Sequence, residues 1–541
     1  MNKPLVLSLA AAAILTTNLN AQSMLERFEA MERQMNALKQ EIAELKSAKI
    51  TSIKNSESSE DEDEDEDDIT VNDKKDNEAE IIVANKDDEA EEESDDEDED
   101  DEENDLASDE ERISDLEESV AELSRSTSGS HLKFKIDYRF SLENLDYKMA
   151  DGSKAKNDAF MTNRLWIDMG YKATNNLSFK GQLAYNKAFG ARSGASSSTN
   201  NSFETFDWIA NENAYDDKVR VRQAYFLWQD QEFFGADIPW TFSIGRRPST
   251  NGHLINFRDD DHASSPLAHA INVEFDGLST KFTLNKDWGT SIKLCAGRGM
   301  SNAAPKFTST PYAEVNSDNT AIDLAGFIFI PYDDKQYSIN TMYYYANNLI
   351  DAINPANQTA GFDTVGGMHS FTGNFTINGI GDEWSDFLDE TTFFISGAMS
   401  KTDPDADQGM LGSENGESVT GYSYWLGTQF PSFFTEDGRW GMEFNHGSKY
   451  WRSITYGEDT NIGSKIATRG DAFEAYMTEY LVEDILSIQL RYTYIDYEYA
   501  GSNGFFGNTT GDSVKITSNM PSASNYVDKA QDIRFYIRYR Y

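Results

Sequence analysis

The chain has 541 residues, a formal net charge of −47 and a single cysteine, Cys295, so an internal disulfide is excluded. Its hydrophobic content of 38% and mean hydropathy of −0.62 argue against a helical membrane protein, because no run after residue 21 approaches the roughly 20 apolar residues that a spanning helix needs. A transmembrane β-barrel is not excluded by this test, because its strands alternate apolar and polar residues.

The N-terminus has the pattern of a secretory signal peptide over residues 1–21. Lys3 precedes an apolar run from Leu5 to Leu15, and the segment ends Asn-Leu-Asn-Ala before Gln22. A short membrane anchor is the alternative, but the run is too short to span a bilayer. We expect the mature chain to start near Gln22, outside the cytoplasm.

Two short heptad seams follow, in residues 22–50 and 113–130. Their apolar residues step by four and three, which predicts helices with a coiled-coil seam. Because about three heptads are marginal alone, both self-association and an amphipathic helix docked on its own barrel fit the pattern. The seams consist of Met24, Phe28, Met31, Met35, Leu38, Ile42 and Leu45, and of Ile113, Leu116, Val120 and Leu123.

The segment between the seams, residues 51–112, is strongly acidic. From Glu57 to Glu111 there are 33 Asp or Glu against 3 Lys, a charge of −30. Such a stretch has little apolar surface to bury and repels itself, so it predicts a disordered periplasmic linker. Weak binding of divalent cations is the alternative, although no ligand geometry is specified.

Residues 131–541 predict an all-β domain, a transmembrane antiparallel β-barrel of about sixteen strands. The clearest strand is the last, in which Ile, Phe and Tyr alternate with Arg and Tyr up to Tyr541. Its aromatic end resembles the signal by which outer-membrane proteins are recognised for insertion, which implies outer-membrane lipid and the barrel-assembly machinery as partners. The strands are expected at Leu132–Leu142, Arg164–Lys172, Leu177–Tyr185, Val219–Trp228, Trp240–Arg247, Val273–Leu284, Ser291–Gly297, Ile322–Ile330, Tyr337–Tyr345, Met368–Ile377, Thr391–Ser400, Tyr422–Phe430, Trp440–His446, Ala472–Leu481, Leu486–Tyr494 and Ile533–Tyr541.

The connections between these strands alternate between long and short. Short ones include residues 173–176 and 482–484, and long ones include residues 190–218 and 500–529. Short periplasmic turns and long outer loops are typical of outer-membrane barrels. With an even number of strands both termini fall on the same side, so we expect a cell outer membrane protein whose N-terminal segment lies in the periplasm.

Cationic residues recur on the strand faces opposite the apolar ones. If the apolar faces contact lipid, these cations line the pore and concentrate anions. The alternative is that they pair with lumen acids such as Asp137, Asp168 and Glu474 in a transverse ladder, and both can hold in one pore. The candidates are Lys133, Lys135, Arg139, Arg164, Lys180, Arg220, Arg222, Arg491, Arg534, Arg538 and Arg540.

The third long outer loop follows the segment Phe242 to Pro248, which looks like the strand end that leads into this loop in phosphate-selective and related porins. The chain in this way resembles Gram-negative porins, and in sixteen-stranded members the third loop folds inward and narrows the pore. The signal peptide, short coiled coil and barrel together resemble a porin-like bacterial family of unknown function. The constriction candidates in the loop are Arg258, Asp259, Asp260, Asp261 and His262.

Together these features predict a porin-like channel for passive diffusion of small hydrophilic solutes or ions. Weak anion preference follows if the loop acids pair with Arg220 and Arg222, leaving the three arginines of the last strand free. An envelope tether or adhesin with a barrel anchor is the alternative. A hydrolase is disfavoured, because no nucleophile motif accompanies the six His, and we expect no enzyme. A homotrimer is one assembly that the resemblance allows, and an acidic chain is not expected to bind nucleic acid.

Three histidines in the third loop, His253, His262 and His269, lie near three consecutive Asp residues. Imidazole and carboxylate together suit zinc or related ions. Their spacing matches no standard motif, so polar constriction or loop packing is the preferred interpretation.

One outer loop has a partial calcium-binding pattern. Acidic residues occupy its positions 1, 3, 5 and 12, but the glycine required at position 6 is replaced by Gln408. Calcium is therefore the one cofactor candidate, and an acidic hairpin loop is the preferred alternative. The residues concerned are Asp403, Asp405, Asp407 and Glu414.

Overall fold

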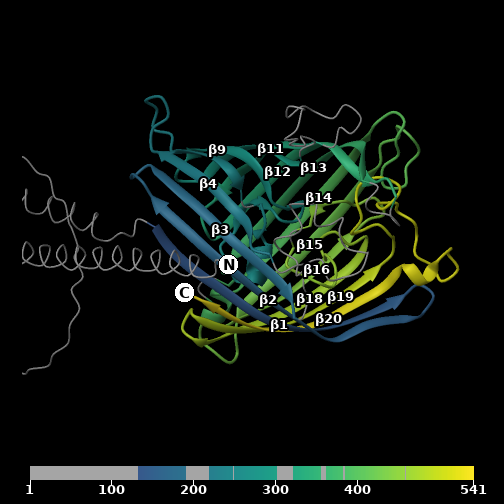
Figure 1. The fold of residues 1–541 in the computed structure, drawn as a ribbon. Helices are drawn as coiled ribbons and strands as arrows, with labels where there is room; N and C mark the ends of the chain where they lie inside the picture. The colour runs from purple at the N-terminus through teal and green to yellow at the C-terminus, as the bar shows by residue number, and fades with distance from the viewer. Residues whose placement is uncertain are drawn as a thin grey trace, which may run out of the picture. The chain divides into compact units, whose positions relative to one another are not determined.

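The computed structural model describes residues 132–189, 218–247, 249–300, 321–354, 361–381, 384–456 and 458–541. The signal peptide, both heptad seams and the acidic linker lie outside these residues. Among the residues described, no helix is both long and apolar enough to cross a membrane. The expected barrel is present: sixteen antiparallel strands form one closed sheet, in which each strand pairs with its sequence neighbours and the last pairs with the first (Figure 1).

All sixteen expected strands are confirmed, and most extend further than the sequence pattern indicated. Successive residues of a strand lie on opposite faces of the sheet. Apolar side chains can therefore face outward while polar side chains face the lumen. The barrel strands are β1 (Leu132–Met149), β2 (Lys154–Lys172), β3 (Leu177–Ala188), β4 (Arg220–Asp230), β5 (Trp240–Arg247), β9 (Phe275–Asn285), β10 (Thr290–Met300), β11 (Ile322–Asp333), β12 (Tyr337–Ala352), β13 (Phe362–Asn378), β14 (Thr392–Pro404), β15 (Thr420–Pro431), β16 (Arg439–Gly447), β18 (Gly470–Val482), β19 (Leu486–Tyr497) and β20 (Val527–Arg540).

The remaining elements are short and lie in the connections. Two pairs of them form small parallel sheets of their own, β6 with β7 and β8 with β17. They are β6 (Gly252–His253), α3 (Ile255–Asp259), β7 (Ser264–Leu267), β8 (Ile271–Asn272), α4 (Asp386–Asp389), β17 (Ile454–Thr455) and the 3-10 helix η3 (Ala523–Asn525).

The last strand closes the barrel, as its alternation predicted. β20 pairs with β1 so that Arg538 lies opposite Arg139. The pairing continues to the final residue, because the Ile136 N–H donates to the Tyr541 carbonyl at 2.7 Å and the Tyr541 N–H donates back to the Ile136 carbonyl at 2.9 Å. Closure leaves no free sheet edge between the first and last strands.

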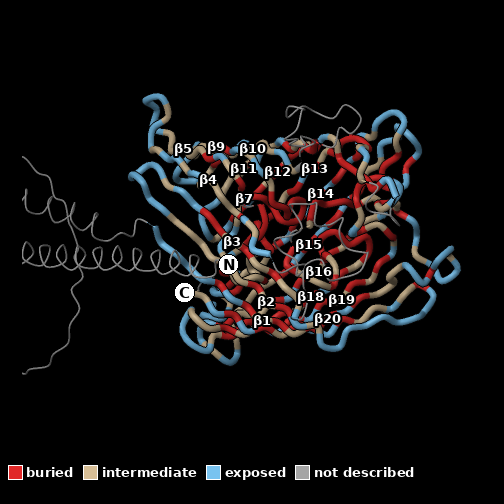
Figure 2. The backbone as a smooth tube through the Cα atoms, in the orientation of Figure 1, coloured by how far each residue is buried: buried red, intermediate tan, exposed pale blue. Residues whose placement is uncertain are grey.

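The two faces of the barrel wall differ as expected. In β1, Phe134 and Ile136 are 59% and 44% exposed on the outer face, whereas Asp137 and Arg139 are buried on the inner face. Figure 2 shows buried residues concentrated along the middle of the barrel and exposed residues at the turns and loop ends. The inside is therefore occupied by other parts of the chain rather than by solvent alone.

The connection between β1 and β2 differs from the sequence prediction. The first outer loop, expected between residues 142 and 164, is a hairpin in which β1 and β2 stay paired up to Lys148 and Lys154. The sequence pattern missed this extension because Lys154 and Lys156 are exposed and carry no alternation of apolar and polar residues. Backbone pairing continues beyond the apolar band, since hydrogen bonding along a strand pair does not require an apolar face.

Candidate pore and its inward loops

The loop between β5 and β9, here named L3 and described for residues 249–274, folds into the barrel. Gln429 Nε2 of β15 donates to the Phe257 carbonyl at 2.9 Å. Gln489 Nε2 of β19 donates to the Arg258 carbonyl at 2.8 Å. Because β15 and β19 lie across the barrel from β5 and β9, L3 crosses the lumen, as the resemblance implied.

His269 holds the far part of L3 against the wall. Its two ring nitrogens each lie 2.8 Å from a serine hydroxyl, that of Ser396 in β14 and that of Ser423 in β15. The imidazole is fully buried and lies 5.7 Å, centroid to centroid, from the Trp425 ring. A neutral ring can donate through one nitrogen and accept through the other, so this geometry fits the uncharged form.

Acidification should weaken the hold of L3 through His269. Burial lowers the pKa of His269 to about 3, whereas an unfolded histidine titrates near 6.5. Between these values the unfolded chain binds more protons, so stability is complete above about pH 6.5 and falls as the pH falls. From about pH 7.5 to about pH 5 we expect a loss of about 2 kcal/mol from this group. Urea unfolding at both pH values should show a smaller loss in His269→Gln, and equal losses in both proteins would contradict this role.

The loop between β16 and β18, here named L7 and described for residues 448–456 and 458–469, also folds into the barrel. Its β17 pairs in parallel with β8 of L3, with Ile454 opposite Ile271. Trp451, Ile454 and Ile466 are fully buried. The sequence interpretation did not anticipate this second inward loop, although apolar residues in a supposedly exposed outer loop were the available signal.

Three arginines of the barrel wall converge on Asp459 of L7. Arg139 Nη2 and Arg164 Nη1 donate to its carboxylate at 2.8 and 3.1 Å, and Arg534 Nη2 lies 3.4 Å away. Burial alone would raise the pKa of Asp459, but the charges of Arg139 and Arg534 hold it well below its usual range. The carboxylate therefore stays ionised and neutralises part of the arginine charge.

A second cluster joins L3, L7 and the wall. Lys465 Nζ of L7 donates to Glu443 of β16 at 2.5 Å and also to Glu474 of β18. Arg258 Nη1 of L3 lies 2.9 Å from Glu458 and 3.6 Å from Glu474. All five side chains are buried, so both loops are fixed by ion pairs that water screens little.

The acids of L3 were predicted to pair with Arg220 and Arg222, and this prediction is wrong. Arg540 donates to the Asp260 carboxylate, and Arg538 Nη2 lies 3.7 Å from Asp261. Arg538 also bonds Asp137 of β1, so the last strand does not present free arginines. Arg222 instead pairs with Glu274 at the end of L3, at 2.9 Å. The arginines of this wall thus follow the transverse-ladder alternative.

Of the other predicted pore-lining residues, three lysines and Arg220 keep solvent contact, whereas Arg491 does not. Lys133 and Lys135 are exposed on the β1 face that carries Asp137, and Lys180 is exposed on the β3 face that carries Gln182. Arg220 is half-buried in β4, whereas Arg491 is fully buried beside Asp459 and donates to its carbonyl at 3.2 Å. The lysines therefore lie at the turn end of the lumen, and the arginines lie deeper.

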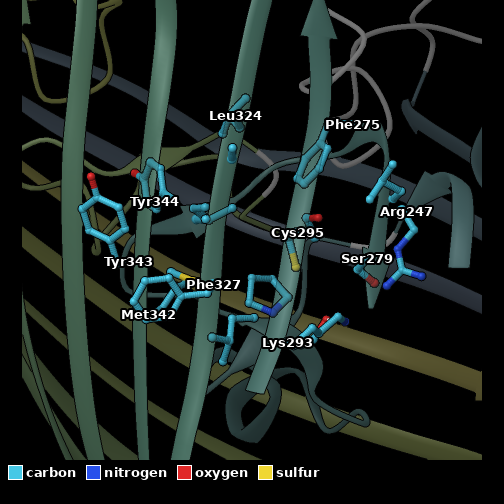
Figure 3. Close-up of a pocket in the computed structure, with 18 residues that line it drawn as sticks. Arg247, Phe275, Ser279, Lys293, Cys295, Leu324, Phe327, Met342, Tyr343 and Tyr344 are labelled. Atoms are coloured by element: carbon cyan, nitrogen blue, oxygen red, sulfur yellow. The ribbon is translucent and has the colours of Figure 1, made fainter. Parts of the chain in front are cut away.

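A small cavity lies between L3 and the wall formed by β9, β10, β11 and β12. Its volume is about 50 Å³. Figure 3 shows the Arg247 guanidinium beside Ser279, with Cys295 and Lys293 on the neighbouring strand. The apolar part of the lining comes from Ile271, Phe275, Leu324, Ile328, Met342 and Tyr344.

No group of three or more His, Cys, Asp or Glu side chains is gathered to hold a metal ion within the described part of the chain. His253 lies 3.2 Å from the Thr376 hydroxyl and His262 is exposed, so the loop histidines do not converge. Asp403, Asp405, Asp407 and Glu414 are likewise not gathered, and calcium binding by them stays a prediction.

Sequence comparison with curated proteins gives no match. Among solved structures, the chain is similar to an anion-selective porin from Comamonas acidovorans, with 10% identity, a TM-score of 0.42 and coverage of 76% of this chain and 99% of that one. It is also similar to OprB of Pseudomonas putida, with 12% identity, a TM-score of 0.42 and coverage of 77% of this chain and 96% of that one. A third similar structure is OmpT, an outer membrane protein of Vibrio cholerae, with 12% identity, a TM-score of 0.39 and coverage of 76% of this chain and 97% of that one.

A family model described as protein of unknown function (DUF3373) matches residues 154–541. This range begins at the first residue of β2 and runs to the end of β20, so it covers the barrel except β1. The chain therefore belongs to the DUF3373 family of proteins of unknown function.

Proposed function

We propose that this protein is an outer-membrane channel for passive diffusion of small hydrophilic solutes or ions, with a weak preference for anions. The closed barrel with an apolar outer face and a charged inner face supports a membrane channel. The short turns and both barrel termini lie at one end, which we place in the periplasm together with the N-terminal segment. The homotrimer and the barrel-assembly machinery stay predictions.

The observation that carries the anion preference is a set of lysines without counter-ions. Lys133, Lys135, Lys180 and Lys281 lie on inward strand faces, and none of them forms an ion pair within the described residues. Asp168 is the acid nearest to them in the register, and it accepts a hydrogen bond from Gln182. A pore entrance lined by these lysines raises the local concentration of anions, because positive charge in a confined channel attracts them at short range.

The arginines support a preference that is weak rather than strong. Arg139, Arg164, Arg534 and Arg538 are buried against Asp459, Glu143 or Asp137. Charges neutralised in this way contribute little field to the pore. Selectivity is therefore assigned to the lysines at the turn end, not to the arginines of the last strand.

Reversal potentials across a planar bilayer in a potassium chloride gradient test this proposal. We expect the wild type to favour chloride, and the double variant Lys180→Gln, Lys281→Gln to lose that preference, because two unpaired lumen charges are removed. Lys286→Gln is the matched control, since Lys286 lies in the turn after β9 and pairs with Asp237 at 2.9 Å. Absence of ion conduction by the wild type, or an equal shift in the control, would refute the proposal.

A further inference from the structure

The cavity between L3 and the β9–β12 wall combines two cations with an apolar lining. Arg247 donates to the Ser243 hydroxyl and lies over the Tyr225 ring at 4.8 Å. Lys293 donates to the Ser265 hydroxyl of L3. Neither cation forms an ion pair with a carboxylate in the described part of the chain, although both are half-buried.

The register of the wall makes this arrangement unfavourable without an anion. Lys293 lies directly opposite Lys281 in the β9–β10 pair. Like charges at such positions destabilise a sheet, because their Cβ atoms are only about 4.5 to 5.5 Å apart. Partly buried charge is costly unless it is paired. A bound anion relieves both effects, and a carboxylate suits a guanidinium because its two oxygens match the paired N–H donors.

The apolar lining determines which chemical group can be attached to the anion. Ile271, Leu324 and Met342 are all at most 6% exposed and belong to one hydrophobic cluster of L3 and the wall. An inorganic anion leaves these side chains without contacts, whereas a short alkyl chain fills the space beside them. A longer chain does not fit, because one water-sized group needs about 10 to 15 Å³ and a cavity of about 50 Å³ holds about three to five such groups.

We propose that the cavity lined by Arg247, Lys293, Ser279 and Cys295 binds a short-chain aliphatic monocarboxylate, of the size of acetate or propionate. The carboxylate lies at the cationic end and the alkyl group lies against Ile271, Leu324 and Met342. This inference rests on the proposed function in that the ligand is taken to be one of the permeating solutes. Affinity should rise by about fourfold from acetate to propionate, as expected for one buried methylene.

Cys295 provides a direct probe, because it is the only cysteine of the chain and lines the cavity. The full chain, folded in detergent, is treated with a small anionic methanethiosulfonate reagent and with its cationic counterpart. We expect the anionic reagent to react faster, and propionate to slow both reactions in a saturable way at millimolar concentration. Hexanoate and chloride at equal ionic strength should not protect the thiol.

Lys293→Gln is the test variant and Lys286→Gln is the matched control outside the cavity. Protection by propionate should be lost in the first and kept in the second. Equal protection by chloride and propionate would overturn the carboxylate assignment, because the site would then take any small anion. If Cys295 does not react, equilibrium dialysis with labelled propionate decides the question, and binding that is absent or independent of Lys293 overturns the proposal.

Bilayer currents recorded on the same preparation separate this inference from the proposed function. Conduction without protection by propionate would reject the carboxylate site and leave the channel. Protection without conduction would reject the channel and leave a carboxylate-binding barrel. Protection together with a propionate permeability that falls in Lys293→Gln is the result expected from both.

Discussion

Asp459→Asn should convert the weak anion preference into a strong one and raise the conductance. Arg139 loses the only carboxylate with which it pairs among the described residues, whereas Arg164 keeps Asp137 and Arg534 keeps Glu143. The cluster therefore gains one uncompensated positive charge at the lumen. One unpaired charge at 4 Å contributes about 1 kcal/mol even in water, equivalent to about fivefold. We therefore expect the chloride-to-potassium permeability ratio to rise at least about fivefold in reversal-potential measurements.

The same substitution removes one of the ion-pair clusters that hold L7 to the wall, while the bonds of Lys465 to Glu443 and Glu474 remain. Breaking a buried ion pair by removing one partner costs about 3 to 5 kcal/mol, because the remaining charge stays uncompensated. Asp528→Asn is the matched control, since it removes the same charge from a pair with Lys148 in which both side chains are partly exposed, at 27% and 47%. Unchanged selectivity and conductance in Asp459→Asn would show that L7 does not restrict the pore.

The barrel could be predicted from the sequence because its physical requirement is local. A strand between lipid and lumen must alternate apolar and polar residues, and this pattern is readable in Phe134, Asp137 and Arg139 or in Phe535 and Arg538. The first hairpin was missed because Lys154 and Lys156 lie in strands that extend past the apolar outer face, where no alternation is needed. Strand number was thus more predictable than strand length.

The inside of the barrel could be predicted only in part. Residue types and faces were readable, and Arg139, Arg164 and Arg538 are inward as expected. Their partners were not readable, because Asp137 and Arg538 are 401 residues apart in sequence, and Arg139 and Asp459 are 320 apart. Which acid reaches which arginine depends on how L3 and L7 fold into the lumen, and periodicity carries no information on that.

Lys465→Met should shift selectivity in the opposite direction, toward potassium. Lys465 is 2% exposed, and its loss leaves the buried Glu443 and Glu474 with two arginines, Arg258 and Arg491, which lie 3.6 and 3.9 Å from Glu474. The excess negative charge that remains attracts cations, and L7 loses the two ion pairs that Lys465 forms with β16 and β18. Lys449→Met is the control, because Lys449 lies in the same loop, its ammonium donates to the Tyr450 hydroxyl, and it forms no ion pair within the described residues. Opposite shifts in Asp459→Asn and Lys465→Met would show that buried charge sets selectivity, whereas equal shifts would mean that release of L7 alone determines what passes.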